Sequence, residues 1–332
     1  MKADGYRFSV APMMGWTDRH CRALMRLFTR RAWLYSEMIT ADAVIHGDRA
    51  RLLAHDPRHG PVALQLGGSD PGLLALAAAI GADFGYDEIN LNVGCPSDRV
   101  RSGRFGACLM AEPKLVASCV RAMKRSVGVP VTVKCRIGID GQEPARVLPA
   151  FAARVADAGA DALIVHARKA WLEGVSPREN RELPPLDHAL VHRLRAAMPD
   201  LPVVINGGIR TLDAARAHLA HVDGVMLGRS AYQTPELLGR VDRDIFGDRD
   251  GARKAGDVVR RYLDHVGREC AAGTPLAAMT RHMLGLYHGA PGARAWRRHL
   301  SQHCRRTGAG PRVVLEALEL VRRAREATAQ AA

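Results

Sequence analysis

Eight short apolar segments, most of them followed by a stretch with helical spacing, constrain the fold of this chain more than any other feature. The segments span residues 8–14, 33–39, 61–68, 87–94, 129–138, 161–168, 201–208 and 223–229. Between them, Ala- and Leu-rich stretches such as 71–83 and 144–161 repeat their apolar residues at the period of a helix. Eight strand–helix units in about 240 residues predict an α/β fold, a parallel (β/α)8 TIM barrel.

A doubly wound sheet is the alternative, because it also alternates strands and helices. The polar residues favour the barrel, whose enzymes build their sites at the carboxyl ends of the strands. Polar side chains at those ends are Gln65, Asn92, Lys134, Arg136, His166, Asn206 and Arg229. In addition, the first segment runs into "MMGWTDRHCR", which lacks the Gly-x-Gly-x-x-Gly pattern typical of a doubly wound nucleotide-binding sheet.

The repeated ending Gly-Ala-Asp, at 81–83 and 159–161, predicts a helix-terminating glycine before each following strand. The strand pattern itself stops after about residue 235. Segments 253–270 and 311–330 have the spacing of amphipathic helices, and 281–306 predicts a helix, a Gly/Pro turn and a basic helix. We therefore predict a barrel over 1–240 and a smaller all-α domain over 241–332.

Positive charge is concentrated in this last part of the chain. The formal net charge is +14, and from Ala252 onward 15 Lys and Arg stand against 6 Asp and Glu, a net +9. Such an excess favours a polyanionic partner, although a generally basic surface would give the same count. A membrane partner is not expected, because the basic residues are interleaved with core-type apolar positions.

Seven cysteines are scattered without a Cys-x-x-Cys pair or zinc spacing, so we expect free thiols and no metal. They are Cys21, Cys95, Cys108, Cys119, Cys135, Cys270 and Cys304. Neither an apolar run of membrane-spanning length nor a signal-peptide pattern is found, which predicts a cytoplasmic protein. A monomer is expected.

Glycines and an arginine follow the seventh and eighth segments, where barrels often bind phosphate. Gly207, Gly208 and Gly228 allow close approach of the backbone, and Arg229 adds a planar cation. Each loop alone is consistent with a tight turn, but both in this order favour a phosphate site.

Two cations, Lys134 and Arg136, lie one pleat apart on the same face of the fifth segment. Their burial is costly without an anion, and a reduced flavin, whose ring becomes negative near N1, is one such anion. Gln65 and His166 are candidate donors to the same ligand, and residues 12–14 could lie against a flat ring. The alternatives are a lysine that reaches solvent and ordinary structural polar residues.

Cys95 follows the fourth segment at the same rim. A metal ligand would need companions, and a nucleophile needs a lowered pKa and a paired base. A general acid needs only a protonated thiol, which is the usual state of cysteine near neutral pH. The neighbouring Asp98 opposes ionisation, whereas Arg99 and Arg101 favour it, so the balance stays open. A buried structural role suits Cys119 and Cys135 better.

Together these residues resemble the tRNA-dihydrouridine synthases, specifically their A subfamily. The matching segments run in order along nearly the whole chain: "APMMGWTDRHCR", "LQLGGSDP", "EINLNVGCPSDRV", "SGRFGACLM", "VTVKCRIGID", "VHARKAWLEGVSP", "NGGI", "LGRSAYQTP" and "GLYHGAPGARAWRRHLS". The resemblance implies an FMN-binding barrel with a helical tRNA-binding domain. It further implies reduction of uridine to 5,6-dihydrouridine in the tRNA D-loop, at positions 20 and 20a, with NADPH (or NADH) as reductant.

The resemblance also assigns roles to particular residues. It places the proton donor on Cys95. FMN contacts fall on Pro12, Met13, Met14, Gln65, Lys134, His166, Asn206, Gly207, Gly208, Gly228 and Arg229. Contacts to tRNA fall on Asn92, Arg178, Arg181, Arg294 and Arg297. One departure is Gly15, where the subfamily usually has aspartate.

Two other functions fit parts of the pattern. An FMN-dependent barrel dehydrogenase acting on a free pyrimidine would share the cofactor and the cysteine, but it needs no basic helical domain. A non-catalytic tRNA-binding protein would share the charge, but it needs neither Cys95 nor Lys134 nor His166.

Overall fold

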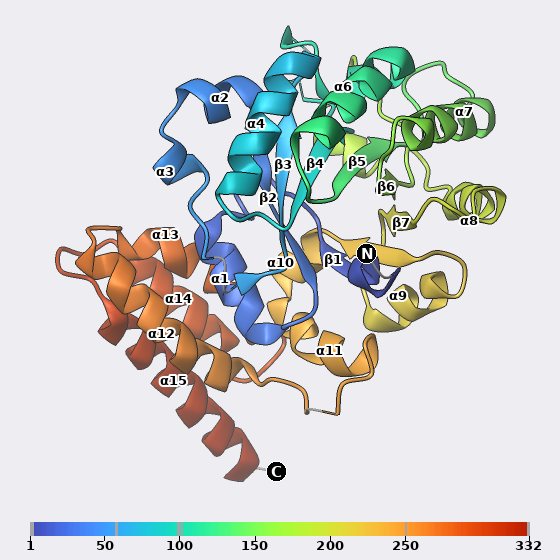
Figure 1. Cartoon of the computed structure of the whole chain (residues 1–332). Helices are drawn as coiled ribbons and strands as arrows, with labels where there is room; N and C mark the ends of the chain where they lie inside the picture. The colour runs from blue at the N-terminus through green and yellow to red at the C-terminus, as the bar shows by residue number, and fades with distance from the viewer. Residues whose placement is uncertain (1–2, 57–58, 98–99, 101, 250, 331–332) are drawn as a thin grey trace. The chain divides into compact units, whose positions relative to one another are not determined.

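In the computed structural model of this protein, eight parallel strands close into a barrel in chain order. The structure, drawn in Figure 1, describes residues 3–56, 59–97, 100, 102–249 and 251–330. The strands are β1 (Phe8–Val10), β2 (Trp33–Thr40), β3 (Val62–Gly67), β4 (Glu88–Val93), β5 (Val131–Arg136), β6 (Ala162–His166), β7 (Val203–Asn206) and β8 (Gly224–Leu227). The predicted (β/α)8 barrel, with a helical C-terminal region, is confirmed.

Internal contacts divide the chain into two compact units. The barrel unit comprises Met1–Met14 and Trp33–Gly228, and the helical unit comprises Gly15–Ala32 and Arg229–Ala332. The helical unit is therefore built from two separate stretches of sequence. The predicted domain division at residue 240 stays a prediction.

Helices follow most strands of the barrel unit, and side-chain caps start several of them. They are α2 (Ala41–His46), α3 (Arg49–Leu52), α4 (Pro71–Asp83), α6 (Pro113–Ser126), α7 (Pro144–Asp157), α8 (His188–Ala197) and α9 (Leu212–Leu219), with 3-10 turns η1 (Ala3–Tyr6), η3 (Gly106–Ala111) and η4 (Glu179–Arg181). Asp70 caps α4 by accepting from the Leu73 N–H at 2.8 Å, and Pro71 occupies the first turn, where no intrahelical N–H bond is lost.

The first strand is shorter than the segment 8–14 that predicted it. The Ala11 N–H still donates to Leu227 O at 2.8 Å, but β1 ends at Val10. Pro12 has no N–H with which to continue the ladder, and this explains the early end.

The two Gly-Ala-Asp sequences behave differently. Gly159 follows α7 with φ +91°, as expected for a helix-terminating glycine. That expectation is wrong for Gly81, which lies inside α4, while Gly85 adopts the positive φ of +86°. A Cβ at Gly81 would overlap the Leu64 side chain, so this glycine serves the packing of α4 against β3.

The helical unit contains all the helices predicted near the C-terminus except one. Its elements are α1 (Arg19–Phe28), α10 (Arg229–Gln233), η5 (Pro235–Arg240), α11 (Val241–Asp244), α12 (Ala255–Ala271), α13 (Leu276–Thr280), η6 (Arg281–Met283), α14 (Ala293–His303) and α15 (Pro311–Gln330). The helix predicted at the start of 281–306 is only the short turn η6, because Tyr287 and Gly289 adopt positive φ. No helix among the described residues is long and apolar enough to span a membrane.

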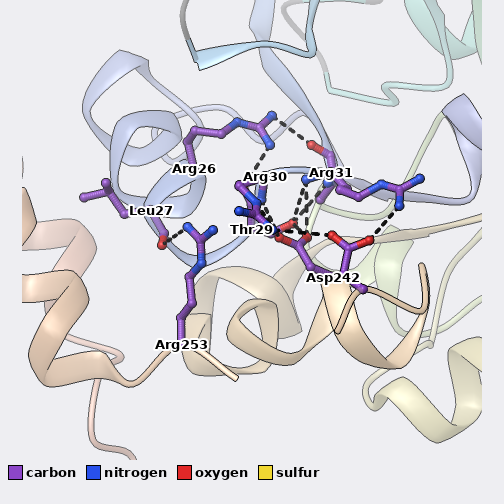
Figure 2. A network of polar contacts seen from close by, with 9 residues as sticks. Arg26, Leu27, Thr29, Arg30, Arg31, Asp242 and Arg253 are labelled. Carbon is purple, nitrogen blue, oxygen red and sulfur yellow. Dashed lines mark hydrogen bonds and ion pairs between the residues drawn. The ribbon is translucent and has the colours of Figure 1, made fainter. Parts of the chain in front are cut away.

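A buried carboxylate joins the two stretches of the helical unit, as Figure 2 shows. Asp242, which is 7% exposed, accepts from Thr29 Oγ1 at 2.5 Å, from the Arg30 N–H at 2.8 Å and from the Arg31 N–H at 3.3 Å. Arg253 adds a further link by donating to Leu27 O at 3.0 Å. These bonds explain why residues 15–32 belong to the helical unit.

Replacing Asp242 by alanine should destabilise the helical unit by about 2 to 4 kcal/mol. The variant leaves the Thr29 hydroxyl and two backbone N–H groups without their acceptor. Urea denaturation followed by circular dichroism measures the change. As a control, Asp213→Ala removes a carboxylate that is 81% exposed, and it should leave stability unchanged. Equal stability of both variants would contradict the assigned role of Asp242.

Candidate active site at the barrel rim

A side-chain cap holds the turn that carries Cys95. Asn92, near the end of β4, accepts through Oδ1 from the Gly94 N–H at 3.1 Å and from the Cys95 N–H at 2.9 Å. Cys95 O in turn accepts from the Ala107 N–H at 2.9 Å. The thiol is half-buried and donates to Ser97 Oγ at 3.5 Å. The strand therefore stops at a turn whose backbone is fixed on both sides of the cysteine.

The Asn92 amide is itself held by a buried chain of amide hydrogen bonds. Asn92 Nδ2 donates to Gln65 Oε1, Gln65 Nε2 donates to Asn90 Oδ1, and Asn90 Nδ2 donates to Thr132 Oγ1, each at 2.8 Å. All four residues are less than 8% exposed. Because each amide is oriented by the next, the chain fixes which atoms Asn92 presents to the cysteine turn.

The series of hydrogen bonds that begins at Asn92 ends at a buried glutamate, Glu88. Thr132 Oγ1 and Tyr35 Oη both donate to Glu88 Oε1, the latter at 2.7 Å. Glu88 is fully buried, and this burial raises its pKa to about 7. Within the described part of the chain, Glu88 Oε2 has no hydrogen-bond partner. A continuous series of polar contacts thus runs through the barrel from Glu88 to Cys95.

Lys134 lies beside Asn92 in the register of β4 and β5. Its Nζ donates to Asn206 Oδ1 at 3.3 Å, while Asn206 Nδ2 donates to Met226 O at 2.7 Å. Burial, with a smaller effect from Arg136, lowers the pKa of Lys134 to about 8. An anionic ligand would compensate this poorly solvated cation.

His166 ends β6 between Arg136 and Asn206 in the strand register. Burial, followed by the nearby Arg136 and Lys134 charges, holds its pKa well below the usual value, so the ring is neutral. Its buried Nδ1 has no hydrogen-bond partner among the described residues. Such an atom is suited to bonding a ligand.

Glycines form the turns after β7 and β8, beside these groups. Gly207 and Gly208 have φ of +110° and +74°, which other residues rarely adopt. A Cβ on Gly207 would lie 2.9 Å from the His166 ring. At the end of β8, a Cβ on Gly228 would lie 3.8 Å from Met13 Sδ, so the loops after β1 and β8 are neighbours. The absence of a side chain at Gly207 therefore lets the backbone approach the His166 ring closely.

Arg136 links two loops through hydrogen bonds to their backbone carbonyls. It is 5% exposed, and its guanidinium donates to Gly94 O at 3.1 Å, Asn180 O at 3.0 Å and Lys169 O at 3.2 Å. Asn180 sits in the loop that carries the exposed Arg178 and Arg181. The prediction that Arg136 meets an anionic ligand stays a prediction, and among the contacts described here its partners are backbone carbonyls.

The barrel unit holds most of the residues singled out from the sequence. Those in the barrel unit are Pro12, Met13, Met14, Gln65, Asn92, Cys95, Lys134, His166, Arg178, Arg181, Asn206, Gly207, Gly208 and Gly228. Arg229, Arg294 and Arg297 belong to the helical unit, as does Gly15, whose φ is +73°. Asp98, Arg99 and Arg101 lie outside the described residues. Cys119 and Cys135 are buried, as expected, and all seven cysteines are free.

Sequence reasoning missed the interior part of the site. Tyr35, Glu88, Asn90 and Thr132 lie within strands rather than at strand ends, so their positions suggested ordinary core. The available signal was a run of polar residues at alternate positions of β4, Glu88, Asn90 and Asn92, which share one face.

The rim thus offers a thiol, a buried ammonium group, an imidazole with an open nitrogen and glycine backbone. This donor set suits a flat anionic ligand with a phosphate group, beside which the thiol can act as an acid.

Comparison with known proteins identifies the family. The dihydrouridine synthase (Dus) family model matches residues 9–324. This chain belongs to the dihydrouridine synthase family. Three similar relatives, each named tRNA-dihydrouridine(20/20a) synthase, come from Escherichia coli O6:H1 (54% identical over 95% of this chain and 96% of that protein), Vibrio cholerae (53%, 94% and 95%) and Xanthomonas axonopodis pv. citri (54%, 96% and 94%). The dihydrouridine synthase match therefore extends over both units.

Glu88→Gln should flatten the pH dependence of stability in this dihydrouridine synthase. The pKa of Glu88 in the folded state, about 7, exceeds its ordinary value of 4.5, so the folded protein retains a proton that the unfolded chain releases. Stability should therefore fall as pH rises between these values, by about 3 kcal/mol at most. Glutamine keeps the acceptor for Tyr35 and Thr132 and does not titrate.

Urea unfolding of both proteins at pH 5 and pH 7.5 measures this effect. Glu112→Gln, which changes an exposed carboxyl, serves as the matched control and should keep the wild-type pH dependence. If Glu88→Gln lost as much stability as the wild type between the two pH values, Glu88 would not be the titrating group.

Proposed function

We propose that this protein is a tRNA-dihydrouridine synthase that reduces the C5=C6 bond of uridine to 5,6-dihydrouridine in the tRNA D-loop, at positions 20 and 20a. Its reductant is NADPH (or NADH), and its cofactor is FMN. The supporting observation is a Dus family match along nearly the whole chain, combined with a thiol held at the rim beside Lys134 and His166.

FMN suits the residues at this rim. Lys134 supplies a cation without an anionic partner among the contacts described here, and His166 Nδ1 supplies an unoccupied polar atom. Gly207 and Gly208 would offer backbone N–H groups to a phosphate group. The remaining proposed contacts are Pro12, Met13, Met14, Gln65, Asn206, Gly228 and Arg229. When bound, FMN supplies the hydride that adds to C6 of the uracil ring.

Cys95 would deliver the proton to C5 from the other face of the uracil. Asn92 would then have two functions. Its Oδ1 fixes the cysteine turn, and one Nδ2 hydrogen bonds Gln65, which leaves the second Nδ2 hydrogen for the substrate ring. Arg136 keeps the turn in place by holding Gly94 O.

The tRNA would meet arginines of both units. In the barrel unit, the exposed Arg178 and Arg181 lie on the loop held by Arg136. In the helical unit, Arg294, Arg297 and Arg298 line a hollow of about 520 Å³ at the start of α14. A target uridine must leave its stack before a reducing group can reach it, and these cations would hold the backbone meanwhile.

Cys95→Ala should lower the rate of dihydrouridine formation about 10² to 10⁴-fold, because the general acid is lost. The measurement is mass spectrometry of D-loop fragments after unmodified tRNA is incubated with protein and NADPH, where each reduction adds two hydrogens. Cys108→Ala changes another half-buried free thiol and should retain activity.

The same assay separates the alternatives. Reduction of free uridine or uracil but not of tRNA would indicate a free-pyrimidine dehydrogenase. A protein that binds tRNA, remains colourless with added FMN and adds no hydrogens would be a non-catalytic tRNA-binding protein. Normal turnover by Cys95→Ala would remove this thiol from the mechanism.

Arg294→Ala combined with Arg297→Ala should weaken tRNA binding and reduce its salt dependence. Each lost phosphate contact lowers the slope of log K against log salt by about 0.7 to 0.9, because fewer counterions are released. Binding titrations at several salt concentrations measure the slope.

The control variant Arg312→Ala with Arg322→Ala makes the same charge change on α15, where both arginines pair with glutamates. Its slope should stay closer to the wild-type value. Equal slopes for the two double variants would argue against a tRNA contact at α14.

A further inference from the structure

Two histidines and a glutamate from distant parts of the sequence meet in the helical unit. His20 lies on α1, and His265 and Glu269 lie on α12. One potential ligand atom of each lies within 4.8 Å of the others. His20 Nδ1 and His265 Nε2 are 3.0 Å apart. Among the described residues, this is the one such group of three.

The surrounding structure holds these side chains in place. His265 and Glu269 are four residues apart and therefore share one face of α12. Tyr262, one turn earlier, stacks on the His265 ring at 5.1 Å and donates its hydroxyl to His20 O at 2.9 Å. His20 is only 6% exposed. The two imidazoles are thus arranged by packing, as a binding site requires.

The geometry is close to that of a tetrahedral metal site. Two imidazole nitrogens bound to one zinc ion at about 2.0–2.1 Å are about 3.3 Å apart. We propose that His20, His265 and Glu269 bind a divalent transition-metal ion such as Zn²⁺, with water as the fourth ligand. Two imidazoles and a carboxylate form a donor set that zinc accepts.

Arg19 forms an ion pair with the carboxylate of Glu269. Its guanidinium donates to both oxygens of Glu269, at 2.7 and 2.6 Å, and Thr274 Oγ1 adds a bond at 2.9 Å. The Arg19 side chain is 39% exposed, so it can turn into solvent when a cation arrives. The metal ion would replace one positive partner of Glu269 by another.

Metal binding changes the hydrogen bond between the two rings, because a metal ion binds the neutral form of imidazole. A neutral imidazole has one N–H and one lone pair. The ion would replace the hydrogen bond between the two rings, whose nitrogens would move apart to about 3.3 Å to bind it. One ring would shift its N–H to its other nitrogen, and no proton need be released.

A second group of histidines, on α8 and at the C-terminal end of α9, is a possible competing zinc site. His192 Nε2 and His218 Nδ1 are also 3.0 Å apart, with the rings of His188 and His221 adjacent. This group has no carboxylate in the described contacts, and His188 Nε2 bonds Gly207 O. Because it could bind zinc weakly, it must be removed from the experiment.

The test is a Zn²⁺ titration of the full chain in competition with a chromophoric chelator. Every protein carries His192→Ala and His218→Ala, which remove the second histidine group. This reference should bind one zinc ion. His265→Ala and Glu269→Gln should each weaken binding by more than about 100-fold. Loss of a residue that only hydrogen-bonds a metal ligand already costs about 10- to 100-fold in affinity, and loss of a ligand costs more.

Arg19→Ala should tighten zinc binding by about 5-fold, because a partly exposed competing ion pair is lost. Arg260→Ala makes the same charge change on α12, at an exposed arginine that pairs with Asp257, and should leave the affinity unchanged. Circular dichroism checks folding, and Glu269→Gln, which preserves the side-chain shape, decides the result if His265→Ala does not fold.

Two results would overturn the proposal. The first is that neither the reference nor Arg19→Ala binds zinc. The second is that His265→Ala and Glu269→Gln bind it as tightly as the reference. The proposal goes beyond the reduction of uridine and departs from the expectation of no metal, which rested on cysteine spacing alone.

Discussion

The buried guanidinium of Arg136 organises the barrel mouth. A charge with 5% exposure is costly unless its donors are satisfied, and here three backbone carbonyls satisfy them. Those carbonyls belong to the turn before Cys95 and to the long loop after β6. Both loops are therefore tied to the same strand end on β5. Loops that carry reactive groups are usually mobile, and ordering them on substrate binding costs conformational entropy. The hydrogen bonds from Arg136 reduce this cost, because they hold both loops in place before substrate binds.

The inside of the barrel contributes a second constraint. Apolar layers fill most barrels of this kind, but here Glu88, Asn90 and Gln65 occupy interior positions. Gln65 bonds Asn90 directly, and Thr132 links Asn90 to Glu88. The buried amides are tolerated because their neighbours complete their hydrogen bonds. Each amide from Asn90 to Asn92 therefore has a defined orientation. The position of the Cys95 turn thus depends on residues buried inside the barrel.

Much of this was predictable from the sequence, because strand order and strand position follow from apolar periodicity. Seven of the predicted segments contain their strands within a residue or two, and β1 stopped early for a reason local to Pro12. Gly81 shows the limit of local rules. A glycine before a strand looks like a helix end, but its role is set by Leu64, which faces it from another element.

Other features could not be predicted, because they arise from residues far apart in the chain. Thr29 and Asp242 are 213 positions apart, and His20 and His265 are 245 apart. No pattern within a window of ordinary length relates such pairs. The sequence therefore indicated a C-terminal helical region but not its dependence on residues 15–32.

That dependence has a consequence for how the protein is made. On the ribosome, residues 15–32 emerge some two hundred residues before Asp242 and α12. The barrel strands are completed in between. The helical unit must therefore assemble last, with its earliest segment waiting for its partners, and a fragment beginning at residue 229 would lack the carboxylate's natural donors.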